Sequence, residues 1–296
     1  MNRPLRSFLF SPANHPRRVE KVFMLGADAA ILDLEDAVAV TEKPKARTMA
    51  VTALQRSRPC LAYVRVNAID TEFCYDDLVN IVGPGLDGIV LPKVESADGL
   101  LTVDWLISQL ERRASMPIGC IDIIPIVETG KGLMAVEEIA RAGSRRVRRI
   151  AFGAGDFTFD MNLTWSANER ELEYARSRLV ATSRAAGLEP PLDSVWVDLQ
   201  DQEGLRQSAE MVLRMGFQGK MGIHPSQIAV INDVFSPSAD EVAYAERIIA
   251  AFDAAEADGS AALQVDGKFI DYPIVYRARR ILELMSAIRK DDNALV

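Results

Sequence analysis

The sequence predicts a (β/α)8 barrel followed by a C-terminal extension, and two patterns lead to this prediction. Eight apolar segments alternate with segments of helical spacing up to about residue 235. The apolar segments are nearly continuous, as strands are when helices cover a parallel sheet. The length of 296 residues and the hydrophobic fraction of 49% suit one barrel with a large core. We therefore place the barrel at residues 1–235 and the C-terminal helices, with a lid segment, at residues 236–296.

The predicted strands share an apolar run that gives way to polar residues at its carboxyl end. They cover residues 7–12, 29–34, 61–67, 88–94, 121–127, 150–154, 194–199 and 219–223. The predicted barrel helices have apolar residues three and four positions apart, or are bounded by capping and helix-breaking residues. They cover residues 16–24, 42–54, 75–81, 96–113, 130–143, 169–186 and 202–215. Beyond the barrel we expect helices at residues 238–257 and 274–289, joined by a polar segment that contains glycine.

A doubly wound open sheet is the alternative arrangement for alternating strands and helices. That fold normally carries a glycine-rich phosphate-binding turn after its first strand. The residues around the end of the first predicted strand, SPANHP at 11–16, contain no glycine. The barrel is therefore the preferred prediction.

The overall charge and the cysteines restrict the partners and the compartment. A net charge of −8 argues against a general binder of nucleic acids or membrane surfaces, although a local basic cluster can still hold a phosphate. No apolar run reaches membrane-spanning length, and the run near the basic N-terminus is too short for a signal peptide. Cys60, Cys74 and Cys120 have no metal-ligand spacing and form no even-numbered disulfide set. We therefore expect free thiols in the cytoplasm.

Two acidic residues follow neighbouring predicted strands. Glu128 comes directly after the apolar run at 121–127, and Asp156 follows the run at 150–154. The carboxyl ends of neighbouring parallel strands meet at the face where barrels bind ligands. Two hard oxygen ligands without nearby Cys or His suit Mg²⁺, which also takes waters and substrate oxygens. The alternative is that both are solvated loop acids, or that Asp156 caps the helix that follows.

Other predicted strand ends are also rich in ionisable or polar residues, which is typical of a barrel active site. They are Glu35, Asp36, Arg65, Asn67, Lys93, Glu95, Asp198 and His224. Polar loops explain part of this pattern, but Arg65 and Lys93 lie within apolar runs and need partners if they are buried. Arg65 can offer a bidentate fork to a substrate carboxylate, and Glu35 and Asp36 can hold Arg65 or metal-bound waters. His224 before Pro225 is more typical of a structural histidine at the barrel rim, and it is assigned no role.

Lys43 and Arg47 are the best-placed cations for a phosphate. They lie four residues apart on one face of the helix predicted at 42–54, which follows the acidic strand end at Glu35 and Asp36. The alternative is an ordinary solvated helix face.

Eight motifs, spread over nearly the whole chain, resemble a known family. They are RSFLFSP at 6–12, DLEDAV at 33–38, RVN at 65–67, LPKVE at 91–95, PIVET at 125–129, FGAGDF at 152–157, GKMGIHPSQI at 219–228 and DGKFIDYP at 266–273. As a set they resemble the citrate lyase β-subunit-like branch of the HpcH/HpaI aldolase superfamily. The resemblance implies a (β/α)8 barrel, a homotrimer or hexamer, Mg²⁺ on Glu128 and Asp156, and contact of Arg65 with the oxo-acid part of the substrate.

The resemblance also implies a role for the C-terminal segment. In relatives that use coenzyme A, this segment is a lid over the active site of a neighbouring subunit. The aspartate of its G-x-φ-I-D-x-P pattern is the acid or base for the α-carbon of the thioester, and this aspartate corresponds to Asp271. The polar segment at 258–267 contains Gly259 and Gly267, so we expect it to move as a lid.

Three functions are therefore considered. The first is a Mg²⁺-dependent lyase that cleaves or forms a 3-hydroxy-3-carboxy acyl-CoA, such as (3S)-citramalyl-CoA or malyl-CoA. Cleavage gives acetyl-CoA and a 2-oxo acid. The second is a citrate lyase β subunit that acts on a citryl group on an acyl carrier protein within a larger complex. The third is a catalytically silent barrel scaffold, which the presence of Glu128, Asp156, Arg65 and Asp271 disfavours.

Overall fold

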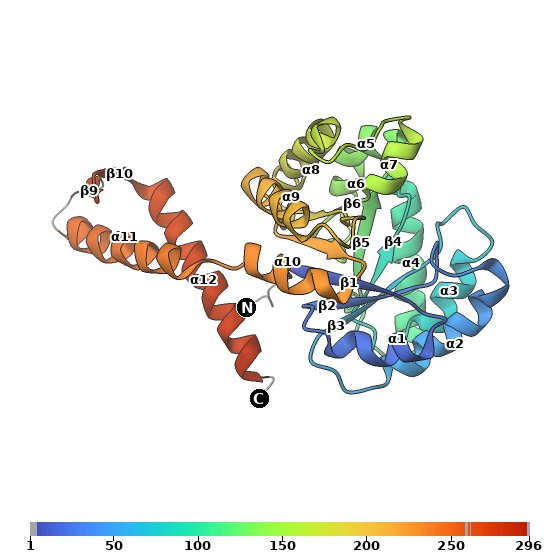
Figure 1. The fold of residues 1–296 in the computed structure, drawn as a ribbon. Helices are drawn as coiled ribbons and strands as arrows, with labels where there is room; N and C mark the ends of the chain where they lie inside the picture. The colour runs from blue at the N-terminus through green and yellow to red at the C-terminus, as the bar shows by residue number, and fades with distance from the viewer. Residues whose placement is uncertain (1–4, 258–259, 261, 295–296) are drawn as a thin grey trace. The chain divides into compact units, whose positions relative to one another are not determined.

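The structure is a computed structural model that describes residues 5–257, 260 and 262–294. It divides into a barrel unit, Leu5–Phe235, and a C-terminal unit that begins at Ser236 (Figure 1). No described helix is long and apolar enough to cross a membrane.

The barrel unit is a closed barrel of parallel strands in sequence order, which confirms the predicted fold class. The strands are β1 (Ser7–Pro12), β2 (Ala29–Asp33), β3 (Leu61–Arg65), β4 (Gly88–Leu91), β5 (Asp122–Val127), β6 (Ala151–Phe152), β7 (Leu192–Asp193) and β8 (Gly219–Gly222). The barrel closes where Phe8 of β1 lies beside Ala29 of β2 on one side and Met221 of β8 on the other.

The helices of the barrel unit surround the strands (Figure 1). They are α1 (Pro16–Lys21), α2 (Lys43–Leu54), α3 (Cys74–Ile81), α4 (Ala97–Arg113), α5 (Gly130–Met134), α6 (Val136–Arg141), α7 (Ala154–Asp160), α8 (Glu173–Ala185), α9 (Gln202–Met215) and α10 (Ile228–Val234). Side chains cap the N-termini of several of these helices. Ser96 accepts a hydrogen bond from the amide of Gly99 at 3.1 Å, and Asp201 accepts one from the amide of Gly204 at 2.8 Å.

Alternate residues of each strand pack on opposite sides of the sheet, and both sides are apolar. Phe8 and Ile31 belong to the cluster inside the barrel, whereas Leu9 and Leu32 belong to the cluster between the strands and the helices. Both faces are therefore shielded from water, which explains why the strands appear in the sequence as nearly continuous apolar runs.

Most predicted strands differ from the observed ones by one to three residues at an end, and the differences in the sixth and seventh strands bear on acidic residues. The seventh strand is Leu192–Asp193 rather than 194–199, because Asp193 is a buried strand residue that the apolar pattern passed over. Its carboxylate is satisfied inside the fold by Arg176, at 2.8 Å and 3.0 Å, and by Lys220 of β8. The sixth strand ends at Phe152, and Ala154 already begins α7, so Asp156 lies within the first helical turn instead of capping it.

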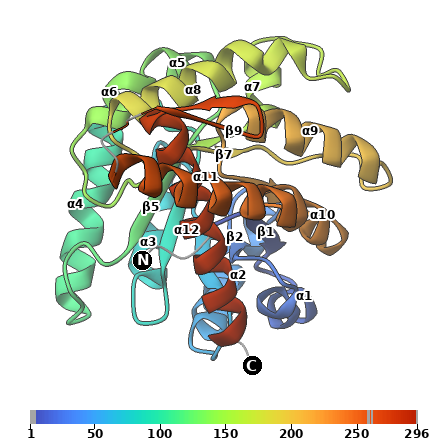
Figure 2. The same cartoon turned by 90° about the vertical axis from the view of Figure 1, so that its left-hand side faces the viewer.

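The C-terminal unit is a helical pair with a β-hairpin between the helices (Figure 2). It contains α11 (Ala239–Ala257), β9 (Leu263–Val265), β10 (Lys268–Ile270) and α12 (Tyr272–Ala294), and its core includes Phe252 and Val275. Asp266 and Gly267 form the hairpin turn with φ of 49° and 78°. An Asp-Gly pair with two positive φ angles is a strong hairpin signal, which the prediction of a plain polar segment did not use. Within that predicted lid, Asp258, Gly259 and Ala261 lie outside the described residues.

Candidate active site

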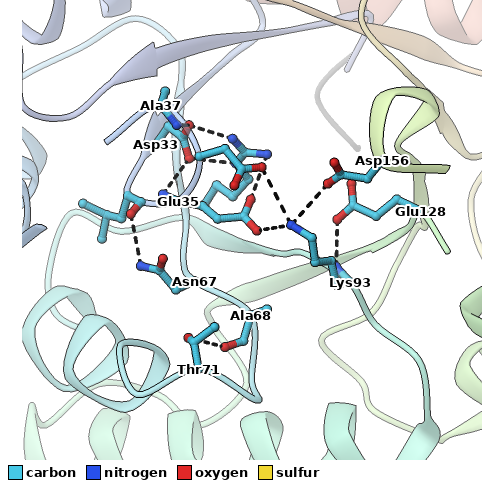
Figure 3. Close-up of polar contacts among 12 residues, drawn as sticks. Asp33, Glu35, Ala37, Asn67, Ala68, Thr71, Lys93, Glu128 and Asp156 are labelled. Carbon is cyan, nitrogen blue, oxygen red and sulfur yellow. Dashed lines mark hydrogen bonds and ion pairs between the residues drawn. The ribbon is translucent and has the colours of Figure 1, made fainter. Parts of the chain in front are cut away.

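Ionisable side chains from five neighbouring strand ends gather at one end of the barrel. Asp33 ends β2, Arg65 ends β3, Lys93 follows β4, Glu128 follows β5, and Asp156 follows β6. Figure 3 shows that Glu35, Lys93, Glu128 and Asp156 point toward one another. This is the carboxyl end of a parallel barrel, where its loops build ligand sites.

Arg65 is held by two carboxylates of the segment at the end of β2. Its Nε and Nη2 donate to the two oxygens of Asp33, each at 2.7 Å, and its Nη1 lies 2.9 Å from Glu35 Oε2. Burial alone would lower the pKa of Arg65, but Asp33 and Glu35 outweigh it and raise that pKa, so the guanidinium stays charged. Two of the five N–H groups of Arg65 donate hydrogen bonds to Asp33, and Nη1 makes an ion pair with Glu35, so N–H groups of the guanidinium remain for another acceptor.

Glu35 was expected near Arg65, but the second partner is Asp33 instead of Asp36. Asp36 is largely exposed, and its carboxylate lies 3.7 Å from Lys93 Nζ. Asp33 was not expected in the site because it lies within the apolar run that predicts the second strand, residues 29–34. Its position before Glu35 in DLEDAV, opposite Arg65 in the strand register, is the signal that was available.

Glu128 is a buried carboxylate with only 4% exposure. One oxygen, Oε1, accepts a hydrogen bond from the Lys93 amide at 2.8 Å. Burial, and then the negative charges of Glu35 and Asp156, raise the pKa of Glu128 to about 8. The other oxygen, Oε2, lies against Gly153, where a Cβ atom would come within 2.3 Å of it. Glycine at position 153 therefore makes the room that Glu128 occupies.

Lys93 contacts acidic side chains that the sequence pattern did not identify as its partners. Its Nζ lies 2.7 Å from Glu35 Oε1 and 3.2 Å from Asp156 Oδ2. Its backbone has a φ of 49°, a left-handed conformation that costs a non-glycine residue about 1–2 kcal/mol. The surrounding contacts hold Lys93 in this conformation despite that cost.

The donor set fits a divalent cation such as Mg²⁺. Glu128 and Asp156 supply carboxyl oxygens from adjacent strand ends, and a cation would offset both the burial of Glu128 and the negative charges of Glu35 and Asp156 beside it. Among the described residues, no three His, Cys, Asp or Glu side chains are arranged to hold a metal between them. A cation at Glu128 and Asp156 would therefore take its remaining ligands from water and substrate oxygens, as Mg²⁺ usually does.

Lys43 is a structural residue, and this corrects its expected role in binding phosphate. It is 5% exposed, and its Nζ donates to Leu34 O at 2.8 Å, Glu35 O at 3.0 Å and Asn67 Oδ1 at 2.7 Å. An ammonium has three N–H groups, so these three acceptors use all of them. Lys43 thereby ties the loop after β2 to the loop after β3.

Arg47 is committed in the same way and lies on no solvated face. It is 8% exposed, and its Nε donates to Asp77 Oδ1 at 2.6 Å. Its Nη2 donates to Phe73 O at 3.4 Å, and its Nη1 lies 3.7 Å from the exposed Asp76 carboxylate. Because α2 packs against α3 at this point, Arg47 joins two helices, and its guanidinium is engaged there instead of at a phosphate.

His224 and Asp271 have contacts of their own, each within its own unit. His224 is exposed after β8, and its Nδ1 lies 2.8 Å from Ser226 Oγ, so it caps the short turn that follows. Asp271 belongs to the C-terminal unit, between β10 and α12. Its backbone carbonyl accepts hydrogen bonds from the amides of Ile274 and Val275 at 3.1 Å and 3.0 Å, which begins α12.

Known proteins are similar to this chain over nearly its whole length. The HpcH/HpaI aldolase/citrate lyase family matches residues 6–225. Citrate lyase subunit beta of Leuconostoc mesenteroides subsp. cremoris is 36% identical, over 97% of this chain and 95% of its own length. The L-malyl-CoA/beta-methylmalyl-CoA lyase of Cereibacter sphaeroides is also 36% identical, over 96% of each chain.

Solved structures of related proteins are also similar to this chain. CitE from Mycobacterium tuberculosis, in complex with magnesium, acetoacetate and coenzyme A, has a TM-score of 0.77 and 30% identity, over 95% of this chain and 98% of that one. RipC from Yersinia pestis has a TM-score of 0.66 and 33% identity, over 80% of this chain and 97% of that one.

Arg47→Met tests the structural role of Arg47. Removing the guanidinium leaves the fully buried Asp77 carboxylate without its cation, so we expect the free energy of unfolding to fall by about 3–5 kcal/mol. Lys45→Met is the matched control on the same helix, because the Lys45–Glu42 pair is exposed and should contribute less than about 1 kcal/mol. Urea unfolding of both variants measures the difference. Unchanged stability of Arg47→Met, with weaker thioester binding, would restore the phosphate role.

Proposed function

Because this chain belongs to the HpcH/HpaI aldolase/citrate lyase family, we propose that it is a Mg²⁺-dependent lyase of 3-hydroxy-3-carboxy acyl-CoA thioesters, such as (3S)-citramalyl-CoA or malyl-CoA. The products of cleavage are acetyl-CoA and a 2-oxo acid. The observation that carries the proposal is the convergence of Glu128, Asp156 and Arg65 at one end of the barrel, with two carboxylates for a hard cation and a cation for a carboxylate.

A bound Mg²⁺ would supply Lewis-acid chemistry at the substrate's hydroxyl and carboxylate oxygens. The protein's part is to position the groups around those oxygens. Glu128 and Asp156 would hold the cation, and the N–H groups of Arg65 that Asp33 does not use would donate to the substrate carboxylate. Glu35 keeps Arg65 in place through its contact at 2.9 Å, and Asp36 lies at the solvent-facing edge of the same cluster.

Cleavage breaks the bond between the thioester α-carbon and the hydroxyl-bearing carbon. The hydroxyl loses its proton and becomes the carbonyl of the 2-oxo acid, and the bonding electron pair moves to the α-carbon. That carbon then takes up a proton, which completes acetyl-CoA without any net change in protons. We assign this proton donor to Asp271, in line with the motif GKFIDYP; in the reverse reaction Asp271 is the base.

A citrate lyase β subunit is the second candidate, because the relative of that name is as similar to this chain as the malyl-CoA lyase is, each at 36% identity. The two candidates differ in what carries the thioester. Turnover of free CoA thioesters by the purified single chain would favour the first. Turnover only of a citryl group on an acyl carrier protein, with partner subunits present, would favour the second.

Cleavage of CoA thioesters is the direct test of the proposal. We expect the purified protein to release a 2-oxo acid from malyl-CoA or citramalyl-CoA in the presence of Mg²⁺. Asp156→Asn should lose at least about 100-fold in kcat/KM with its fold intact by circular dichroism, since a hard cation prefers a charged oxygen. Full activity in EDTA, or in Asp156→Asn, would rule out the metal assignment.

Gly153→Ala tests whether the room beside Glu128 matters for the cation. A Cβ at this position would lie 2.3 Å from Glu128 Oε2 and 2.7 Å from Glu128 Cβ, so the carboxylate must shift. We expect Mg²⁺ affinity, measured by calorimetry, to fall about ten-fold or more. Gly155→Ala, two residues along, is the control because nothing lies within 4 Å of its Cβ position. Equal Mg²⁺ affinity in the two variants would contradict the argument.

Complementation tests whether a neighbouring chain completes the site. We propose a homotrimer or hexamer in which Asp271 of one chain serves the metal site of another, as the family resemblance implies. Co-refolded Asp156→Asn and Asp271→Asn chains should then regain part of the lyase activity that each lacks alone. Mass spectrometry verifies that the mixtures have exchanged subunits. If such mixtures remain inactive, Asp271 acts within its own chain or is not the acid.

A further inference from the structure

Lys93 touches both proposed metal ligands, through two different groups. Its backbone N–H donates to Glu128 Oε1 at 2.8 Å, and its Nζ lies 3.2 Å from Asp156 Oδ2. The proposed reaction uses neither contact. One residue thus links the carboxylate after β5 to the carboxylate after β6 (Figure 3).

The ammonium of Lys93 lies among three carboxylates. Besides Asp156, it contacts Glu35 Oε1 at 2.7 Å and Asp36 Oδ2 at 3.7 Å. Carboxylates around an ammonium stabilise its charged form, so Lys93 serves as a cation within this cluster. The side chain is 35% exposed, so it has room to change its rotamer.

The backbone and the side chain of Lys93 differ in their freedom to move. The backbone is fixed in a left-handed conformation, with φ of 49°, that aims its N–H at Glu128. The aliphatic stem and the ammonium are partly exposed, and Glu35 and Asp36 offer acceptors other than Asp156. The amide contact can therefore persist while the contact with Asp156 is exchanged.

We propose that Lys93 is the resident counter-ion of this acidic cluster, and that a divalent cation displaces its ammonium from Asp156 while its backbone amide keeps Glu128 in place. This inference rests on the proposed metal site. A cation bound to Asp156 and an ammonium 3.2 Å from the same carboxylate would repel each other, so the ammonium moves toward Glu35 and Asp36. Lys93 is thus a positioning residue that sets the affinity for the metal.

The proposal predicts that removing the ammonium tightens metal binding. Loss of one positive charge about 5 Å from a divalent ion, in a partly exposed site, should lower the dissociation constant about ten-fold. The opposite role, an ammonium that orients Asp156 for the metal, predicts weaker binding after the same substitution. The direction of the change therefore separates the two roles.

The experiment measures Mn²⁺ binding by electron paramagnetic resonance, with Mg²⁺ as competitor, on the full chain. Lys93→Met removes the charge but keeps the stem, and Lys93→Gly keeps the amide and favours the positive φ, so it covers the case in which Lys93→Met folds poorly. Lys131→Met is the charge-matched control, because Lys131 is 72% exposed and pairs with Glu95 instead. Asp156→Asn reports whether binding occurs at the proposed site.

Tighter binding in both Lys93 variants, with Lys131→Met near the wild type, supports the proposal. Unchanged or weaker binding in the Lys93 variants, with wild-type binding still lost in Asp156→Asn, overturns the role of Lys93 and leaves the metal site standing. If the wild-type protein shows no metal binding that depends on Asp156, both the role of Lys93 and the proposed metal site are overturned.

Displacement is measured directly by trace acetylation of lysines with quantitative mass spectrometry. Mg²⁺ should raise the reactivity of Lys93 at least about two-fold relative to Lys131, because the amine is released from Asp156. This rise should be absent in Asp156→Asn. Reactivity of Lys93 that does not change with saturating Mg²⁺ would mean that the ammonium stays on Asp156, and would overturn the displacement.

Discussion

Like charges held close together at one end of an apolar barrel are the constraint on which the rest of the site depends. Glu35, Glu128 and Asp156 come from different strand ends, and burial, followed by the charges of Glu35 and Asp156, raises the pKa of Glu128 to about 8. Such an arrangement is unfavourable unless the scaffold fixes it and cations compensate it. Arg65 and Lys93 provide that compensation in part, which leaves the cluster suited to a further cation.

Buried polar contacts around the cluster help to fix the scaffold that holds it. Lys43 joins the loops after β2 and β3, and Arg47 with Asp77 joins α2 to α3. Between the strands and the helices, Asp193 of β7 is paired with Lys220 of β8 and with Arg176 of α8. Because a buried charge without its partner is costly, each pair restricts how the elements that carry it can pack. The position of the site therefore depends on polar contacts as well as on the apolar core.

In the proposed reaction, the cluster would act on the part of the substrate at which the carbon–carbon bond breaks. The citrate lyase β subunit and the malyl-CoA lyase are equally similar to this chain, at 36% identity. A hydroxyl and a carboxylate on the carbon that becomes a carbonyl are common to both kinds of substrate, and hard cations and guanidinium groups recognise such oxygens. The choice between a carrier protein and coenzyme A concerns the other end of the thioester.

The sequence by itself determined the barrel, because apolar periodicity is local and eight strands buried on both faces leave a continuous apolar pattern. It also indicated Glu128, Asp156, Glu35 and Arg65 together, since parallel strands bring their carboxyl ends to one face. Only the tertiary structure decided which carboxylates pair with the lysine and arginine side chains. Asp33 lies 32 residues from Arg65, Asp77 lies 30 from Arg47, and Glu35 lies 58 from Lys93. Whether a lysine or an arginine is solvated or fully paired depends on how such distant segments pack, which no local pattern contains.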